Sequence, residues 1–139
     1  MEKELTLSDT IRHVREFHDA FKIKNRRKPS VELSEQEINL RFNLMKEENE
    51  EYLEAAKAGN IVEVADALGD MLYILCGTIN AHGLQDYMAD VFKEIQRSNM
   101  SKLDENGHPI YREDGKVLKS NLYFRPDIAA ILATDVSGK

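Results

Sequence analysis

Apolar residues recur at the spacing of an α-helix along most of this chain. The period predicts four long helices, and capping residues mark where they begin and end. Ser34 followed by Glu37 forms a capping box before the second helix, which Gly59 ends. Asn60 is the expected cap of the third helix, and Gly83 ends that one. The predicted helices cover about 7–21, 35–58, 61–82 and 84–100.

The pattern changes after residue 100. The turn dipeptide Asp114-Gly115 separates two short apolar pairs, which predicts a β-hairpin. Pro126 in "RPDIAAILA" is expected in the first turn of a final short helix. We therefore expect an all-α fold, a four-helix bundle core with a short C-terminal β-hairpin and terminal helix. A single domain is expected over 1–139, with the helical core at about 7–100 and the hairpin and terminal helix at about 101–134.

Charge and cysteine content narrow the possible partners and the compartment. The formal net charge of -6 argues against binding to nucleic-acid polymers or anionic membranes. The one cysteine excludes an internal disulfide and fits a reducing cytoplasm. The N-terminal segment has no apolar signal core, and no apolar run approaches the roughly 18 residues of a membrane span. We expect a cytoplasmic protein that does not enter a membrane.

Glutamates crowd the segment "MKEENEEYLEAAKAGN", and they point in different directions when the helix is laid out at about 100° per residue. Glu48 falls about 80° from the centre of the apolar stripe, among apolar neighbours. Glu51 lies one turn on, at the edge of the apolar arc. Glu47 is a further step outward, while Glu50 and Glu54 point to solvent. Two or three of these acids are therefore expected to face inward.

The third predicted helix also carries acids on one side. Glu63, Asp66 and Asp70 share an arc about 80° wide with Tyr73 and Gly77. Nearly all other residues of the helix are apolar, so burial of the whole helix is expected. Its carboxylates then cannot all reach bulk water.

Clustered carboxylates inside a bundle must be protonated or neutralised by cations. A single glutamate on an apolar face is usually an edge residue that bends out to water, but two consecutive helices with inward acids favour a metal site. Carboxylates without cysteine or histidine favour Mg²⁺ or Mn²⁺ over zinc. None of the four histidines follows these acids by three residues, so the Glu-x-x-His pairs of a ferritin-like di-iron site are absent.

The acids also form a recognisable pair of motifs. "EENEE" fits Glu-Glu-x-x-Glu, and "EVAD" fits Glu-x-x-Asp on the next helix. Together they resemble the all-α nucleoside triphosphate pyrophosphohydrolases: MazG-like proteins, dimeric dUTPases and phosphoribosyl-ATP pyrophosphohydrolases. The segments "ADALGDMLYILCGT" and "VFKEIQRSNMSKLDENGHPIYREDGKVLKSNLYFRPD" are similar to the MazG-like branch. The resemblance covers most of the chain, from the first helix to Asp127.

The resemblance implies Mg²⁺-dependent hydrolysis between the α- and β-phosphates of a nucleotide, with Mn²⁺ as a possible substitute. Glu47 and Glu48 are the expected catalytic residues, Glu47 as the group that orients or deprotonates the attacking water. Asp70 lies outside the minimal motif and is a further ligand, an acceptor behind the ligands or a substrate contact. The implied metal ligands are Glu48, Glu51, Glu63 and Asp66.

Phosphates also need positively charged or amide partners. The expected substrate-binding residues are Arg97, Asn99, Lys102, Lys116 and Lys119. For the two hairpin lysines, a solvated surface charge is the competing interpretation. The basic linker "KIKNRRKPS" is either a solvated loop or a segment that attracts an anionic ligand.

The favoured function is a nucleoside triphosphate pyrophosphohydrolase that removes non-canonical or deoxynucleotides, giving a monophosphate and pyrophosphate. Hydrolysis of dUTP is a further possibility within this reaction class, and phosphoribosyl-ATP is the least favoured substrate. The alternative is a non-catalytic helical oligomerisation or nucleotide-sensing module with a structural divalent cation. A short bundle with an acid-lined interior would be open on one side, so a homodimer or homotetramer is expected.

Overall fold

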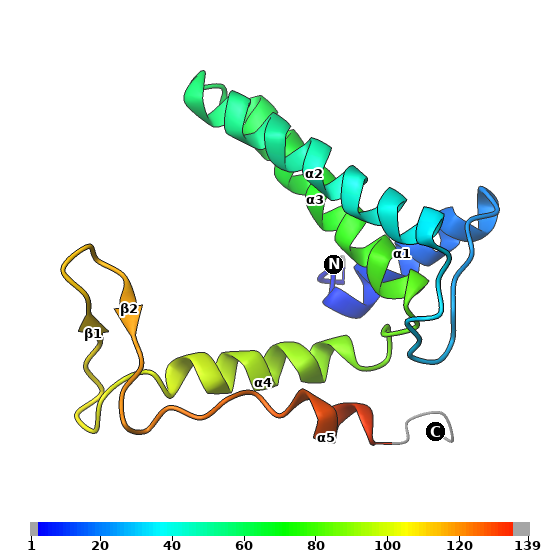
Figure 1. Ribbon diagram of the computed structural model, residues 1–139. Coiled ribbons are helices and arrows are strands. Elements are labelled where there is room, and N and C mark those ends of the chain that lie inside the picture. Colours follow the sequence, from blue (N-terminus) through cyan, green and yellow to red (C-terminus); the bar gives the residue numbers. More distant parts are fainter. Residues whose placement is uncertain (1–2, 135–139) are drawn as a thin grey trace. The chain divides into compact units, whose positions relative to one another are not determined.

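A computed structural model describes residues 3–134 of the chain. The chain divides into two compact units, one up to Gln85 and one from Asp86 onward. The first unit contains α1 (Leu7–Ala20), α2 (Glu35–Lys57) and α3 (Ile61–Ala81). The second contains α4 (Met88–Met100), β1 (Ile110–Tyr111), β2 (Val117–Leu118) and α5 (Ile128–Leu132) (Figure 1). The prediction of an all-α fold with a C-terminal hairpin and terminal helix is confirmed.

In the first unit, α2 and α3 lie side by side along their length, and α1 packs on α3 (Figure 1). The predicted caps are present. The Ser34 hydroxyl accepts from the Glu37 amide at 3.1 Å, and Gly59 takes the left-handed φ of 68° that ends α2. The Asn60 side chain then accepts from the Glu63 amide at 3.2 Å and starts α3. This tight connection makes the two helices antiparallel neighbours.

One expectation about α3 is wrong within a single chain. Burial of the whole helix was expected from its apolar composition, but much of its apolar surface is open. Ile61 is 75% exposed, and Leu68 and Leu72 are each about half exposed. Burial is confined to residues that meet the other two helices, such as Ala67 and Cys76. The apolar pattern of α3 therefore exceeds what one copy of the first unit covers.

In the second unit, serine side chains hold the segment after β2 against the end of α4. The Ser98 hydroxyl donates to the Phe124 carbonyl at 2.8 Å, and the Ser120 hydroxyl donates to the Ser101 carbonyl at 3.0 Å. The predicted hairpin forms with Ile110 opposite Leu118. These bonds make the C-terminal part a defined structure although it contains little regular secondary structure.

Two predicted helix starts lie too early. Residues 85–87 form a turn and α4 begins at Met88, because the apolar period continues through a turn that the sequence does not mark. Pro126 precedes the cap of α5 instead of lying in its first turn, since the Asp127 side chain accepts from the Ala130 amide at 3.1 Å. Among the described residues, no helix is both long enough and apolar enough to cross a membrane.

Candidate active site

The antiparallel arrangement of α2 and α3 sets which side chains face each other. Near one end of the pair, the Arg41 guanidinium donates to the Ile74 carbonyl at 2.8 Å and to the Thr78 hydroxyl at 3.0 Å. These bonds lock the register of the two helices. Because the helices are antiparallel, the second half of α2 consequently faces the first half of α3. The acidic motif of each helix lies in that half.

Glu48 lies at the centre of this group of carboxylates. Its side chain is half-buried, and its Oε2 atom is buried without a hydrogen-bond partner in the described part of the chain. Burial, and then the neighbouring charges of Glu51, Asp70 and Asp66, raise the pKa of Glu48 from 4.5 to about 7. These four residues, Glu48, Glu51, Asp66 and Asp70, are called the acid cluster below. A buried acceptor surrounded by like charges is the arrangement that a cation stabilises.

A pocket of about 470 Å³ opens beside the acid cluster at the connection between the two helices. Glu51, Glu63 and Asp66 line it, together with Asn60, whose cap positions the start of α3. Glu54 lines it too, and its side chain is exposed, as the helical pattern indicated. Its position three residues after Glu51, on the same flank of α2, is the signal that could have identified it.

The structure distributes the predicted acidic residues unevenly over this region. Glu51 and Asp66 belong to both the acid cluster and the pocket, whereas Glu63 lines only the pocket and Asp70 contributes only to the cluster. Glu47 is exposed and is not among the pocket residues. Its assignment as the residue next to the attacking water stays a prediction.

The acid residues fit a hard divalent cation by chemistry. All of them offer carboxylate oxygens, the ligands that Mg²⁺ and Mn²⁺ prefer, and Glu48 has an unsatisfied buried oxygen. Within residues 3–134, no three Asp, Glu, His or Cys side chains converge closely enough to surround one ion. Neighbouring carboxylates repel each other when nothing neutralises them. A cation would therefore have to draw these side chains together by rotation about their own bonds.

The predicted substrate-binding residues all belong to the second unit. There, Arg97 makes a two-bond ion pair with Glu94, at 2.8 and 3.2 Å, and its guanidinium lies 4.2 Å from the centre of the Phe124 ring. Glu94 raises the pKa of Arg97 and also accepts from the Asp127 amide at 2.7 Å. Arg97 therefore has a structural role at the junction of α4 and the segment before α5, and its assignment as a substrate contact stays a prediction.

The other members of this set are less engaged. Lys119 lies with its Nζ 4.6 Å from the centre of the Tyr123 ring, a weak cation–π contact at an exposed site. Asn99 and Lys116 are exposed, and Lys102 is half-buried. Their assignment as substrate contacts stays a prediction.

Comparison with known proteins identifies the family. An uncharacterized protein of Acanthamoeba polyphaga mimivirus is 31% identical over 71 residues, which is 51% of this chain and 28% of the viral protein. This chain thus matches less than a third of the length of that relative. The family model described as phosphoribosyl-ATP pyrophosphohydrolase matches residues 14–99, a range that contains the whole acid cluster and both acidic motifs. The chain belongs to the phosphoribosyl-ATP pyrophosphohydrolase family, within the MazG-like nucleoside triphosphate pyrophosphohydrolase superfamily.

Proposed function

We propose that this protein is a Mg²⁺-dependent nucleoside triphosphate pyrophosphohydrolase that cleaves between the α- and β-phosphates and clears (deoxy)nucleotides from the cell. Membership of a pyrophosphohydrolase family supports the reaction class. The observation that carries the proposal is Glu48, a half-buried carboxylate with an unsatisfied oxygen and three acidic neighbours. Such a group is costly in a protein without a cation and useful in one that binds a metal–triphosphate complex.

In this proposal, Glu48, Glu51, Glu63 and Asp66 hold Mg²⁺, or Mn²⁺ in its place. A cation held by these residues would supply charge neutralisation of the triphosphate and help to activate the attacking water. Glu47 orients the attacking water and takes its proton. The water oxygen bonds to one of the two phosphorus atoms of the α–β link, and the bond from that phosphorus to the bridging oxygen breaks. The bridging oxygen leaves on the other phosphate. Asp70 raises the local negative charge and so strengthens cation binding at Glu48. The protein thus contributes mainly positioning and a fixed field.

The test is pyrophosphate release from a panel of canonical and modified (deoxy)nucleoside triphosphates, with Mg²⁺ and with EDTA. Metal-dependent release of pyrophosphate and a monophosphate is expected, and the best substrate identifies the physiological class. Binding of a nucleotide without turnover would favour the alternative interpretation, a nucleotide-sensing module, over an enzyme. Absence of both binding and turnover would make the acids structural.

We further propose that the protein is a homo-oligomer, a dimer or tetramer, formed through the open apolar side of the α2–α3 pair. Large apolar residues are exposed on both helices, among them Phe42 of α2 at 63% and Ile61 of α3 at 75%. Monomeric proteins rarely leave large contiguous apolar patches in water, so the number of exposed apolar residues on these two helices favours a second copy as their cover. Sedimentation equilibrium should give twice or four times the chain mass, and a monomer at micromolar concentration would contradict the proposal.

A further inference from the structure

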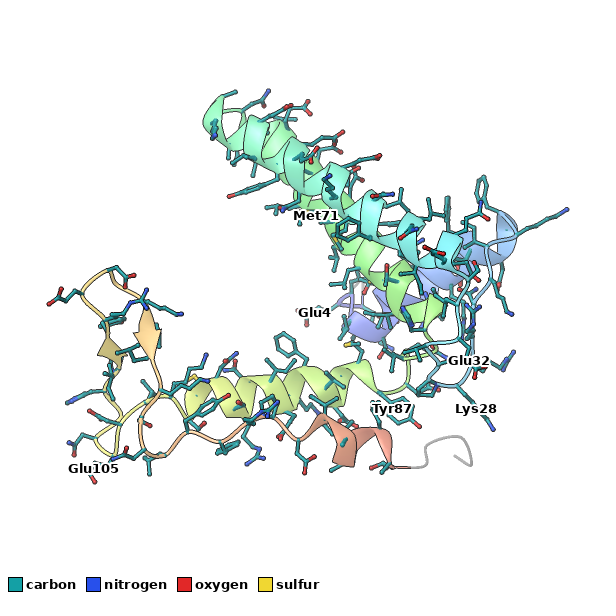
Figure 2. All side chains as sticks on the ribbon, viewed as in Figure 1. Glu4, Lys28, Glu32, Met71, Tyr87 and Glu105 are labelled. Carbon is teal, nitrogen blue, oxygen red and sulfur yellow. The ribbon has the colours of Figure 1, made fainter. Side chains whose placement is uncertain are left out.

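A second pocket lies on the first unit, at the loop between α1 and α2. Its volume is about 520 Å³. The loop that forms most of it is the basic linker, and Figure 2 labels Lys28 on the same loop. The pocket, called the linker pocket below, is lined by Arg15, Asp19, Lys22, Ile23, Lys24, Asn25, Arg26, Arg27 and Gln85.

The linker is fixed in place by the C-terminal end of α3. The Arg26 amide donates to the Asn80 carbonyl at 2.9 Å, and the Ser30 amide donates to the His82 carbonyl at 2.9 Å. The Arg26 guanidinium adds a bond to the Ala81 carbonyl at 2.9 Å. These contacts satisfy carbonyls that the end of a helix leaves without partners. The linker pocket therefore has a preformed backbone, unlike a solvated loop whose positive side chains have no common orientation.

Positive charge in the linker pocket exceeds what its own acids neutralise. Arg26 is paired with Glu37 at 3.2 Å, and the one acidic lining residue, Asp19, accepts a bond from the Asn25 amide at 2.9 Å. The remaining four basic side chains form no ion pair with any residue between 3 and 134. These are Arg15, Lys22, Lys24 and Arg27. In a protein with a net charge of -6, such a local excess favours an anion at this position.

The lining also contains an unused acceptor. The Gln85 amide nitrogen donates to the Arg27 carbonyl at 3.3 Å, which orients the side chain. Its Oε1 atom is buried and has no hydrogen-bond partner in the described part of the chain. Leaving a buried acceptor unpaired is unfavourable, and a ligand hydroxyl would satisfy it once a small rotation of the Gln85 side chain turns this atom toward the pocket. The linker pocket thus combines four unpaired cations with one acceptor for a neutral donor.

We propose that the linker pocket binds a small metabolite that carries both a phosphate and a hydroxyl group, as sugar phosphates and nucleotides do. The acid cluster is a different site, because Glu37, which holds Arg26, and Glu48 lie about three turns apart on α2, roughly 16 Å along the helix axis. Phosphate at the linker pocket meets arginine and lysine directly, so its binding needs no divalent cation. The proposal goes beyond the hydrolysis proposed above and holds whether or not the protein is an enzyme.

The test is isothermal titration calorimetry with ribose 5-phosphate at low ionic strength in EDTA. The Arg15→Gln/Arg27→Gln variant should bind roughly tenfold more weakly or worse, because it loses charge-assisted hydrogen bonds. Lys57→Gln is the control for a lost charge outside the pocket and is compared with the single variant Arg27→Gln, since it removes one exposed positive charge from the last turn of α2. That control and Glu48→Gln should bind as the wild type does. Gln85→Met should weaken the binding of ribose 5-phosphate more than the binding of inorganic phosphate. This difference separates the hydroxyl contact from the phosphate contact.

Several results would overturn the proposal. Wild-type protein that binds neither ribose 5-phosphate nor inorganic phosphate at millimolar concentration has no such site. Equal weakening by Lys57→Gln would show only a general charge effect. Binding that appears only when Mg²⁺ replaces EDTA, and that Glu48→Gln abolishes, would place the anion at the acid cluster. Both arginine side chains belong to exposed residues, so the double variant should keep its helical content. If it does not, Lys24→Gln provides the same comparison with a smaller expected loss.

Discussion

Replacing Glu48 by glutamine should reduce the rate of pyrophosphate release by roughly a hundredfold or more. Mutation of residues that only hydrogen-bond a metal ligand already costs about 10–100-fold in metal affinity or activity, and loss of a ligand should cost at least as much. The substitution keeps the size of the side chain but replaces one acceptor oxygen by an amide donor and removes the negative charge at the centre of the acid cluster. The rise in melting temperature that Mg²⁺ gives the wild type should be lost as well. Steady-state kinetics and thermal melts with and without Mg²⁺ measure both effects.

The matched control is Glu50→Gln, an exposed glutamate in the same acidic run of α2. It removes the same charge from the chain and should leave both the rate and the Mg²⁺-dependent stabilisation unchanged. Wild-type turnover in Glu48→Gln would remove Glu48 from the reaction. A loss of equal size in both variants would point to a general effect of net charge.

The same variant reports on folding through its pH dependence. In the metal-free folded protein the pKa of Glu48 is raised from 4.5 to about 7, so the folded state binds more protons than the unfolded state between these values. The wild-type free energy of unfolding therefore loses a contribution as the pH rises through that interval. In EDTA at pH 8, Glu48→Gln should be more stable than the wild type, and the difference should shrink toward pH 4.5. An inactive variant that is also more stable cannot be explained by misfolding.

Replacing Gly83 by alanine should lower the free energy of unfolding by about 3 kcal/mol. This estimate combines the strain of a left-handed backbone at alanine with the steric clash of the added Cβ atom. Gly83 follows α3 with a φ of 69°, a conformation that L-residues with a Cβ rarely adopt. A Cβ here would also overlap the Lys28 carbonyl, which is backbone and cannot rotate away. The linker would have to move off the end of α3. Urea denaturation of the two proteins measures the loss.

The control is Gly69→Ala, the same substitution inside α3. No atom lies within 4 Å of the position of its added Cβ, apart from its own helix and chain neighbours. Since glycine is a poor residue in a helix interior, this variant should gain about 0.5–1 kcal/mol. Equal stability of Gly83→Ala and wild type would mean that the linker does not rest on the end of α3. It would also remove the preformed backbone on which the linker pocket depends.

Local signals were sufficient for most of the secondary structure. Ser34, Gly59 and Asn60 act through bonds to residues three to five positions away, so their effect is determined by the nearby sequence. Helical periodicity also placed Glu48 next to the apolar arc, where its buried oxygen and raised pKa are found. The start of α4 was misplaced because the apolar period continues through a turn that has neither glycine nor proline.

Long-range contacts decided the rest. Periodicity within α2 could not show that Glu54 lines the pocket with Glu63, because that depends on the distance between two helices. The sequence suggested that Arg97 is a cation available to a substrate. Folding instead places its guanidinium over the Phe124 ring and brings the Asp127 amide to its ion-pair partner Glu94.

By itself, the sequence determined the helices, their caps and which acids belong to the inward arcs, since each of these depends on residues within a few turns. Tertiary structure alone decided that the basic linker docks on the last carbonyls of α3 and gathers its cations around one pocket. The bond between Arg26 and Asn80 joins residues far apart in the chain, and no local pattern encodes it. Hydrogen bonding and packing between distant segments are therefore what turn a basic stretch of sequence into a candidate binding site.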